Sequence, residues 1–234
     1  MLEIYALQQN EILNDEKFNS LLPYISTQKK ARINRYIQRS AAQQTLISDL
    51  LLRSIIHDKL SMKNSDIHFG QNEFGKPYLL GKDNFYFNLS HSGDWVVCAI
   101  SDSVVGIDVE KIKPTDYNIS KRFFSQDEHE YLTCQKGKQR LDTFYDLWTL
   151  KESFIKAVGK GLHMSLRDFS IIIYYDGFIF LKHQIENYLF NFKQFTIDIR
   201  YKLSVCLGSE FKGEELSVIS MTDFLNSIEE KKGM

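Results

Sequence analysis

The sequence predicts an α+β protein made of two similar α/β halves in one chain. A helical stretch is followed by several short apolar segments, and the same order recurs after Pro114, near the middle of the 234 residues. Hydrophobic residues make up 43% of the chain, which is ample material for a core. The motifs most suggestive of chemistry fall at the junction of the halves and in the second half.

The first half opens with an alternating apolar pattern over residues 1–8 that predicts a strand. Residues 15–60 contain no glycine and only Pro23, and apolar residues recur at the helical period between Leu46 and Ile55, so we expect helices there. Turn residues then break the chain into short segments. Three of these segments are expected to be strands: 85–88, 95–101 and 104–109.

The second half returns to a helical pattern after Pro114. Ser125 and Glu128 have the spacing of a capping box at a helix start. The clearest helix covers residues 141–158, and Gly159 is a natural stop. Four further strands are expected at 169–175, 178–182, 195–200 and 203–207. We divide the chain into residues 1–103, residues 104–225 and a charged, disordered tail at 226–234.

Charge and cysteine usage exclude several classes of protein. The 29 basic and 30 acidic side chains give a net charge of −1, which argues against a nucleic-acid partner. Cys98, Cys134 and Cys206 are widely spaced, which indicates reduced thiols and neither a disulfide framework nor a zinc site. We find no export signal and no apolar run long enough for a membrane span. A cytoplasmic protein without a membrane partner is therefore expected.

Two acidic clusters carry the chemical prediction. Asp108 and Glu110 stand two apart in a predicted strand, so both side chains lie on one face. Glu152 and Lys156 stand one turn apart on the predicted helix. Three carboxylates and a lysine suit a magnesium ion that binds a phosphate ester while a cation steadies the departing charge. The alternative for each cluster is ordinary solvent-exposed charge.

Two other groups of residues suit phosphate binding. Ser90 and His91 lie in a small polar segment between two strands, where they could donate to phosphate oxygens or serve only the turn. Basic residues at helical spacing, from Lys29 through Arg32 to Arg39, could bind a terminal phosphate together with Lys76. A solvated helix face is the default for them.

Four blocks occur in a fixed order along the chain: FGKP (74–77), FNLSHS (87–92), VGIDVE (105–110) and WTLKESFIKAVGKGL (148–162). With residues 121–125 and the first strand, they resemble the Sfp-type 4′-phosphopantetheinyl transferases, over the chain as far as about residue 210. The resemblance implies two α/β halves related by a pseudo-twofold axis, with the active site in the cleft between them. It also implies a monomer.

The resemblance implies that the enzyme transfers the 4′-phosphopantetheine arm of coenzyme A to a serine of an apo carrier protein. The reaction would depend on Mg²⁺ and release adenosine 3′,5′-bisphosphate. Carriers of the peptidyl, acyl or aryl type, from peptide synthetases and from polyketide or fatty-acid synthases, all fit. Family analogy favours secondary metabolism, such as nonribosomal peptide and antibiotic synthesis.

The resemblance also assigns roles to residues. Asp108, Glu110 and Glu152 match the magnesium ligands, and Glu152, directly or through a metal-bound water, is the candidate base. Lys156 matches the catalytic lysine beside the pyrophosphate. Coenzyme A contacts are implied for further residues of the first half: Lys29, Arg32, Thr45, Lys76, Ser90 and His91. The family often has lysine at the position of Arg32 and arginine at that of Gln44.

The second half would hold the metal and receive the carrier. Phe154, Gly161, Leu162 and Met164 could form an apolar docking rim, although they could equally belong to the core. Two rival functions use the same residues. One is a Mg²⁺-dependent phosphohydrolase, and the other is a non-catalytic module that binds coenzyme A or a carrier.

Overall fold

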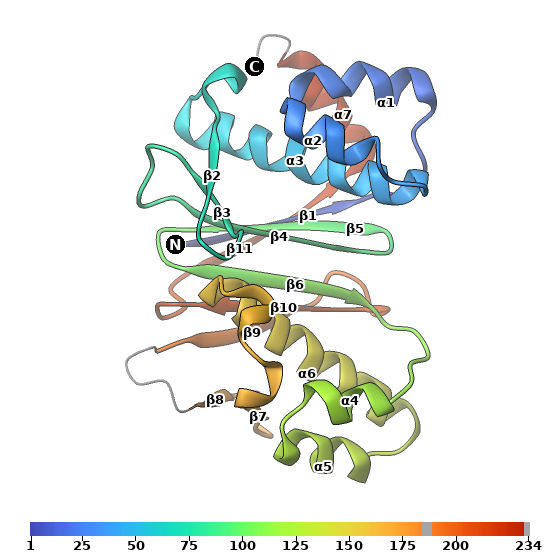
Figure 1. The fold of residues 1–234 in the computed structure, drawn as a ribbon, viewed down its shortest axis with the longest axis vertical. Coiled ribbons are helices and arrows are strands. Elements are labelled where there is room, and N and C mark those ends of the chain that lie inside the picture. Colours follow the sequence, from blue (N-terminus) through green and yellow to red (C-terminus); the bar gives the residue numbers. More distant parts are fainter. Residues whose placement is uncertain (184–188, 232–234) are drawn as a thin grey trace.

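The computed structural model describes residues 1–183 and 189–231 and shows a mixed α+β fold in four layers. Two β-sheets face each other in the middle of the molecule, and helices cover the outer side of each sheet (Figure 1). The first-half elements are β1 (Leu2–Gln8), α1 (Asp15–Leu21), η1 (Leu22–Tyr24), α2 (Thr27–Ile33), α3 (Arg39–Leu60), η2 (Asn64–Asp66), β2 (Phe69–Gln71), β3 (Pro77–Leu79), β4 (Tyr86–Ser92) and β5 (Trp95–Ser101).

The remaining elements begin with the strand that carries the acidic pair. They are β6 (Val105–Lys111), α4 (Asn118–Phe123), α5 (Gln126–Cys134), α6 (Gly137–Val158), η3 (Gly161–His163), η4 (Leu166–Asp168), β7 (Phe169–Ile173), β8 (Ile179–His183), β9 (Asn191–Phe195), β10 (Tyr201–Leu207), β11 (Glu214–Ser220) and α7 (Met221–Glu230). The predicted α+β class is confirmed, with one long helix of 22 residues in each half, α3 and α6.

The sheets are built mostly from antiparallel pairs. The first has the order β11-β1-β5-β4 and the second the order β6-β10-β9, while β2–β3 and β7–β8 form separate hairpins. Apolar side chains from both sheets interdigitate between them, with Ile4 and Val97 on one side and Ile107 and Val205 on the other fully buried. This shared core fixes the two halves against each other, because it removes a large apolar area from water.

The helix α6 begins at Gly137, earlier than the predicted residue 141, and ends as predicted. It continues to Val158 and stops at Gly159, whose φ of 76° favours glycine. The helix α5 starts with the predicted capping box: the Ser125 N–H donates to Glu128 at 2.8 Å, and the Glu128 N–H donates to the Ser125 hydroxyl at 3.4 Å. Both predictions are confirmed.

The end of the chain differs from the prediction. Residues 226–230 are not a disordered tail but belong to α7, because Phe224 and Ile228 face the core of the first half and are buried there. The strand β11 pairs in parallel with β1, so residues 214–230 return to the first half instead of completing the second. The strand expected at 195–200 is also misplaced, since β9 ends at Phe195.

Among the described residues, no helix has the length and hydropathy that crossing a membrane requires.

Candidate active site

The strand β6 presents its acidic residues to α6 and its apolar residues to the core between the sheets. Asp108 is only 4% exposed, so the alternative of a solvent-exposed acidic face is wrong for this residue. Gly106 explains how the helix comes so near, because a Cβ there would lie 2.0 Å from the Ser153 carbonyl oxygen. The glycine therefore lets α6 pack directly over the acidic strand.

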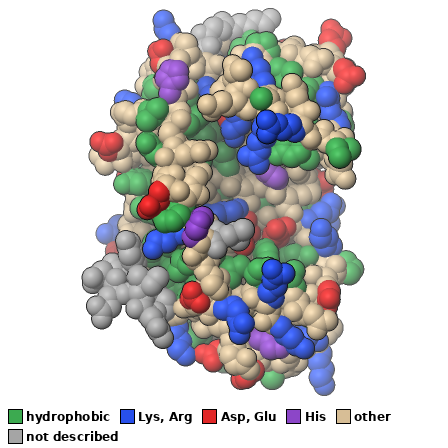
Figure 2. Space-filling model, in the orientation of Figure 1, with side chains coloured by type: hydrophobic (Ala, Val, Ile, Leu, Met, Phe, Trp, Pro, Cys, Tyr) green, Lys and Arg blue, Asp and Glu red, His purple; other side chains and the backbone are tan. Residues whose placement is uncertain are grey.

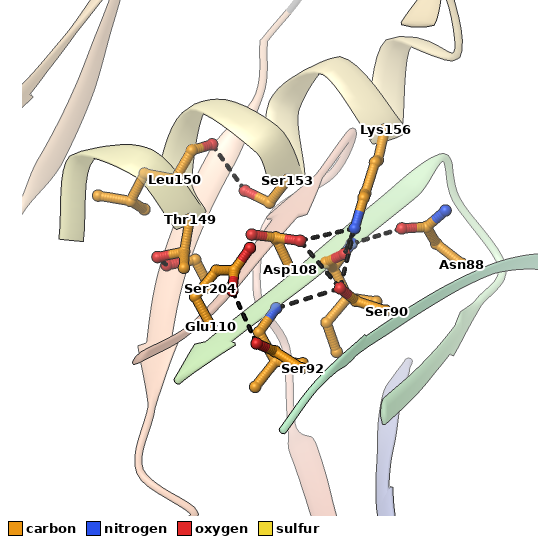
Figure 3. Close-up of polar contacts among 12 residues, drawn as sticks. Asn88, Ser90, Ser92, Asp108, Glu110, Thr149, Leu150, Ser153, Lys156 and Ser204 are labelled. Carbon is orange, nitrogen blue, oxygen red and sulfur yellow. Dashed lines mark hydrogen bonds and ion pairs between the residues drawn. The ribbon is translucent and has the colours of Figure 1, made fainter. Parts of the chain in front are cut away.

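Lys156 joins the two acidic clusters. Its Nζ donates to Asp108 Oδ1 at 2.6 Å, to the Ser90 hydroxyl at 2.9 Å and to the Ile107 carbonyl at 3.2 Å (Figure 3). Ser90 also donates to Asp108 Oδ1 at 2.9 Å. The structure thus brings together Ser90 of the first half with Asp108 and Lys156 of the second.

Glu110 and Glu152 lie in the same charged environment. Burial raises the pKa of Glu152, and the charges of Asp108 and Glu110 raise it further, against the opposing effect of Lys156. Burial likewise raises the pKa of Glu110, opposed by a hydrogen bond from Ser92 and reinforced by Asp108. The three carboxylates therefore repel one another, and a cation would relieve that repulsion.

A pocket opens beside this group, between the two halves. Its volume is about 280 Å³, and its lining combines the 74–77 loop and Asn88 of the first half with Glu152, Lys156 and Gly159 of the second. A substrate there would meet Glu152 and Lys156 on one side and the 74–77 loop, with Lys76, on the other.

The residues fit a magnesium ion by the chemistry of their donors. Asp108 Oδ2 is buried and has no hydrogen-bond partner, so it is an oxygen available to a cation. Across residues 1–183 and 189–231, however, no three His, Cys, Asp or Glu side chains are grouped closely enough to hold a metal ion by themselves. Mg²⁺ is commonly held by one or two carboxylates and completes its coordination with water and substrate phosphates. The open arrangement suits that mode of binding.

A group of basic side chains lies across the hollow from the acids. Lys and Arg side chains gather on the first half, above a histidine and above acidic side chains in the hollow (Figure 2). Desolvation lowers the pKa of His91, and the charges of Lys156 and Arg32 lower it further. The charges of both the basic group and the acidic site therefore act on His91.

Tyr36 organises this basic group, and the sequence did not indicate it. Its hydroxyl accepts hydrogen bonds from Arg32 Nε at 3.2 Å and from the Thr45 hydroxyl at 3.3 Å. The bond from Thr45 lowers the pKa of Tyr36, as do the charges of Arg32 and Lys29. Arg32 and Thr45 thus meet at one hydroxyl, and the charge of Lys29 acts on the same group. The helix is broken between α2 and α3, so the basic residues through Arg39 do not share one face.

Lys76 lies apart from that group. Its Nζ donates to the Ala157 carbonyl at 2.9 Å and to the Val105 carbonyl at 3.1 Å, so it joins the C-terminal end of α6 to the start of β6. Burial lowers the pKa of Lys76 to about 8. The lysine lines the pocket, but the structure does not place it beside Lys29 and Arg32.

The expected docking rim is largely core. Phe154 is 1% exposed and Met164 is 8% exposed, because both pack among the aromatic residues under α6. Gly161 lines the pocket, and the side chain of Leu162 lies outside the described part of the structure. The prediction is therefore wrong for Phe154 and Met164.

The fold and the site define an α+β protein with a pocket between its two halves and a cluster of carboxylates around a lysine beside that pocket. Comparison with known proteins shows to which family this protein belongs. Residues 14–103 match the family model of the 4′-phosphopantetheinyl transferase N-terminal region, and residues 104–206 match that of the 4′-phosphopantetheinyl transferase superfamily.

Whole-chain relatives agree with these matches. The 4′-phosphopantetheinyl transferase Sfp of Bacillus subtilis is 35% identical over 224 residues, which cover 96% of this chain and 100% of the relative. The transferase psf-1 of Bacillus pumilus is 34% identical, covering 97% and 99%. The transferase gsp of Aneurinibacillus migulanus is 36% identical, covering 73% and 71%. The chain belongs to the 4′-phosphopantetheinyl transferase superfamily and is an enzyme of that class.

Proposed function

We propose that this enzyme transfers 4′-phosphopantetheine from coenzyme A to a serine of an apo carrier protein, releasing adenosine 3′,5′-bisphosphate. The observation that supports this most is that Glu152 and Lys156 line one pocket between the halves, while Lys156 binds Asp108 and the charges of Asp108 and Glu110 act on Glu152. The basic group around Tyr36 would bind the 3′-phosphate and adenosine end, with Ser90 and His91 between that group and the acids. Lys76 would contact the arm from the pocket wall.

Asp108, Glu110 and Glu152 would hold Mg²⁺, which when bound neutralises charge on the diphosphate. Lys156 supplies a fixed cation at the same place, because Asp108 and Ser90 hold its Nζ in position. Glu152 would receive the proton of the carrier serine, either directly or through a water molecule, because it is the acidic side chain that lines the pocket. The arm leaves coenzyme A with its phosphate and is joined to the serine oxygen.

The proposed reaction also suggests which carrier proteins the enzyme modifies. Peptide synthetase carriers are the first candidates, and polyketide and fatty-acid carriers are alternatives. We further propose that the protein acts in the cytoplasm. We also propose that it is a monomer, because both sides of the pocket come from one chain.

Mass spectrometry of apo carriers incubated with the enzyme, Mg²⁺ and coenzyme A tests the proposal. We expect each accepted carrier to gain one phosphopantetheine, and bisphosphate release to require both carrier and metal. Bisphosphate release without a carrier would support a phosphohydrolase instead. Binding of coenzyme A with no modified carrier of any class would support a binding module.

A further inference from the structure

Side chains of β4 join the two halves beside the acidic site by bonding to the backbone of β6. The strands β4 and β6 belong to different sheets, yet three alternate side chains of β4, labelled in Figure 3, accept hydrogen bonds from the backbone of three alternate residues of β6. The pairs are Asn88 with the Ile107 N–H at 2.8 Å, Ser90 with the Val109 N–H at 3.3 Å and Ser92 with the Lys111 N–H at 3.1 Å. We call Asn88, Ser90 and Ser92 the β4 ladder.

The two serines of the ladder have a second contact. Ser90 donates to Asp108 Oδ1 at 2.9 Å, and Ser92 donates to Glu110 Oε2 at 2.7 Å. A serine hydroxyl has one proton to donate and two lone pairs that accept. When a lone pair accepts the hydrogen bond from the backbone N–H, the proton remains free to be donated to the carboxylate. Each serine therefore fixes the position of one acidic side chain on the opposite half.

The two carboxylates differ in how much they depend on their serine. Asp108 is also held by Lys156 at 2.6 Å. Among the described residues, Ser92 is the only side chain that hydrogen-bonds Glu110. Glu110 is only partly buried, and a longer side chain with one anchor loses its preferred position when that anchor is removed.

We propose that Ser92 is a positioning residue that orients Glu110 for the metal, so that the first half of the chain sets the metal affinity of the second. This inference rests on the metal site of the proposed function. Groups that hydrogen-bond metal ligands commonly change metal affinity by ten- to a hundredfold when they are removed. Ser92 acts through Glu110 and does not touch the reacting atoms.

The test compares Ser92→Ala, Ser92→Thr and wild type in two measurements. The first is Mn²⁺ binding in the presence of coenzyme A, followed by the electron paramagnetic resonance signal of free Mn²⁺. The second is the Mg²⁺ concentration that gives half-maximal rate. We expect Ser92→Ala to raise the Kd for Mn²⁺ and the Mg²⁺ concentration for half-maximal rate by about tenfold each. Its kcat at saturating Mg²⁺ should stay within about twofold of wild type. Ser92→Thr keeps the hydroxyl and should restore both values.

Tyr201→Phe provides the matched control. The Tyr201 hydroxyl also joins the halves, through the Asp94 N–H at 2.9 Å and Asp94 Oδ2 at 3.0 Å, but it bonds none of the three acidic site residues. We expect this variant to lower the unfolding midpoint and leave the Mn²⁺ affinity unchanged. An equal loss of Mn²⁺ affinity in Tyr201→Phe and Ser92→Ala would overturn the proposal, because it would show only weaker association of the halves.

Two other outcomes would also overturn it: unchanged Mn²⁺ binding in Ser92→Ala, or failure of Ser92→Thr to restore binding. Should Ser92→Ala fail to fold, Ser92→Cys keeps the shape with a weak donor and should weaken Mn²⁺ binding in the same direction. The Mn²⁺ measurement needs no carrier. The inference would therefore stand on its own evidence even if the wild-type enzyme modified none of the carriers.

Discussion

Glu152 combines burial with two neighbouring negative charges. These raise its pKa, so the ionised form is held in the folded protein at a cost in free energy. We expect Glu152→Gln to reduce kcat by about a hundredfold or more, because the variant loses both a base and a metal ligand. In the absence of metal, its free energy of unfolding should be unchanged or higher by about 1 kcal/mol, since repulsion is relieved.

The measurements for this variant are steady-state kinetics with a purified carrier and urea unfolding in EDTA. Glu16→Gln on the exposed face of α1 is the matched control, and we expect it to behave as wild type in both. Near-normal turnover of Glu152→Gln would contradict the assigned role.

Lys76 makes a separate, pH-dependent contribution. Burial lowers its pKa from 10.5 to about 8, so between these values the unfolded chain binds more protons than the folded chain. The contribution of Lys76 to the free energy of unfolding therefore rises with pH through this window and is lowest below about pH 8. As the pH rises from about 8 to 10.5, we therefore expect the free energy of unfolding of wild type to increase relative to that of Lys76→Met.

Urea unfolding at several pH values checks this, with Lys138→Met on the exposed first turn of α6 as the matched variant. The same pH trend in both variants would show that burial of Lys76 is not its cause.

At the scale of single residues, the sequence indicated the acidic site but not the residues that hold it together. The alternation of Asp108 and Glu110 already placed both side chains on one face. Ser92 and Tyr36 gained their roles only when distant segments met, because each role depends on a contact with another element. The alternation of Asn88, Ser90 and Ser92 was a visible signal, since it matches the two-residue period of the acids.

At the scale of elements, the approach of α6 to β6 depends on a single missing side chain. A Cβ at Gly106 would lie 2.0 Å from the Ser153 carbonyl oxygen and 2.4 Å from the Ala157 backbone nitrogen, and backbone atoms cannot move aside independently. We expect Gly106→Ala to destabilise the protein by about 3 kcal/mol or more. It should also reduce activity, because displacement of α6 would separate Lys156 from Asp108.

The matched control is Gly213→Ala, where an added Cβ meets no atom within 4 Å but φ is 73°. Its expected cost is about 1–2 kcal/mol from backbone strain alone, with activity retained. Equal unfolding midpoints for the two variants in thermal denaturation would argue against the steric explanation.

Elements with strong local signals were predictable, and elements fixed by distant pairing were not. The capping box of α5 and the glycine end of α6 are local, so both could be identified. Glu128 also binds the buried Lys151 at 2.7 Å, a contact that no local pattern reveals. The strand β11 pairs Leu2 with Glu214, and its mixed sequence became a strand only because β1 offered an edge.

At the scale of the whole molecule, the end of the chain stabilises its beginning. The helix α7 follows β11 back to the first half, where Met221, Phe224 and Ile228 complete the core that contains Leu46 and Leu50 of α3. Lys231 pairs with Asp58 at 2.6 Å. The site lies between the halves, so the first half must be intact for the ladder to meet β6.

This arrangement predicts that Phe224→Ala, far from the acidic site, destabilises the whole enzyme. Phe224 is 3% exposed, and removal of a buried aromatic ring typically costs about 3–5 kcal/mol. We expect a fall of that size in the free energy of urea unfolding, with kcat at low temperature unchanged in the folded fraction. Thr222→Ala, at an exposed position of the same helix, should change neither. A loss below about 1 kcal/mol for Phe224→Ala would mean that α7 is only loosely attached, as the sequence had suggested for the end of the chain.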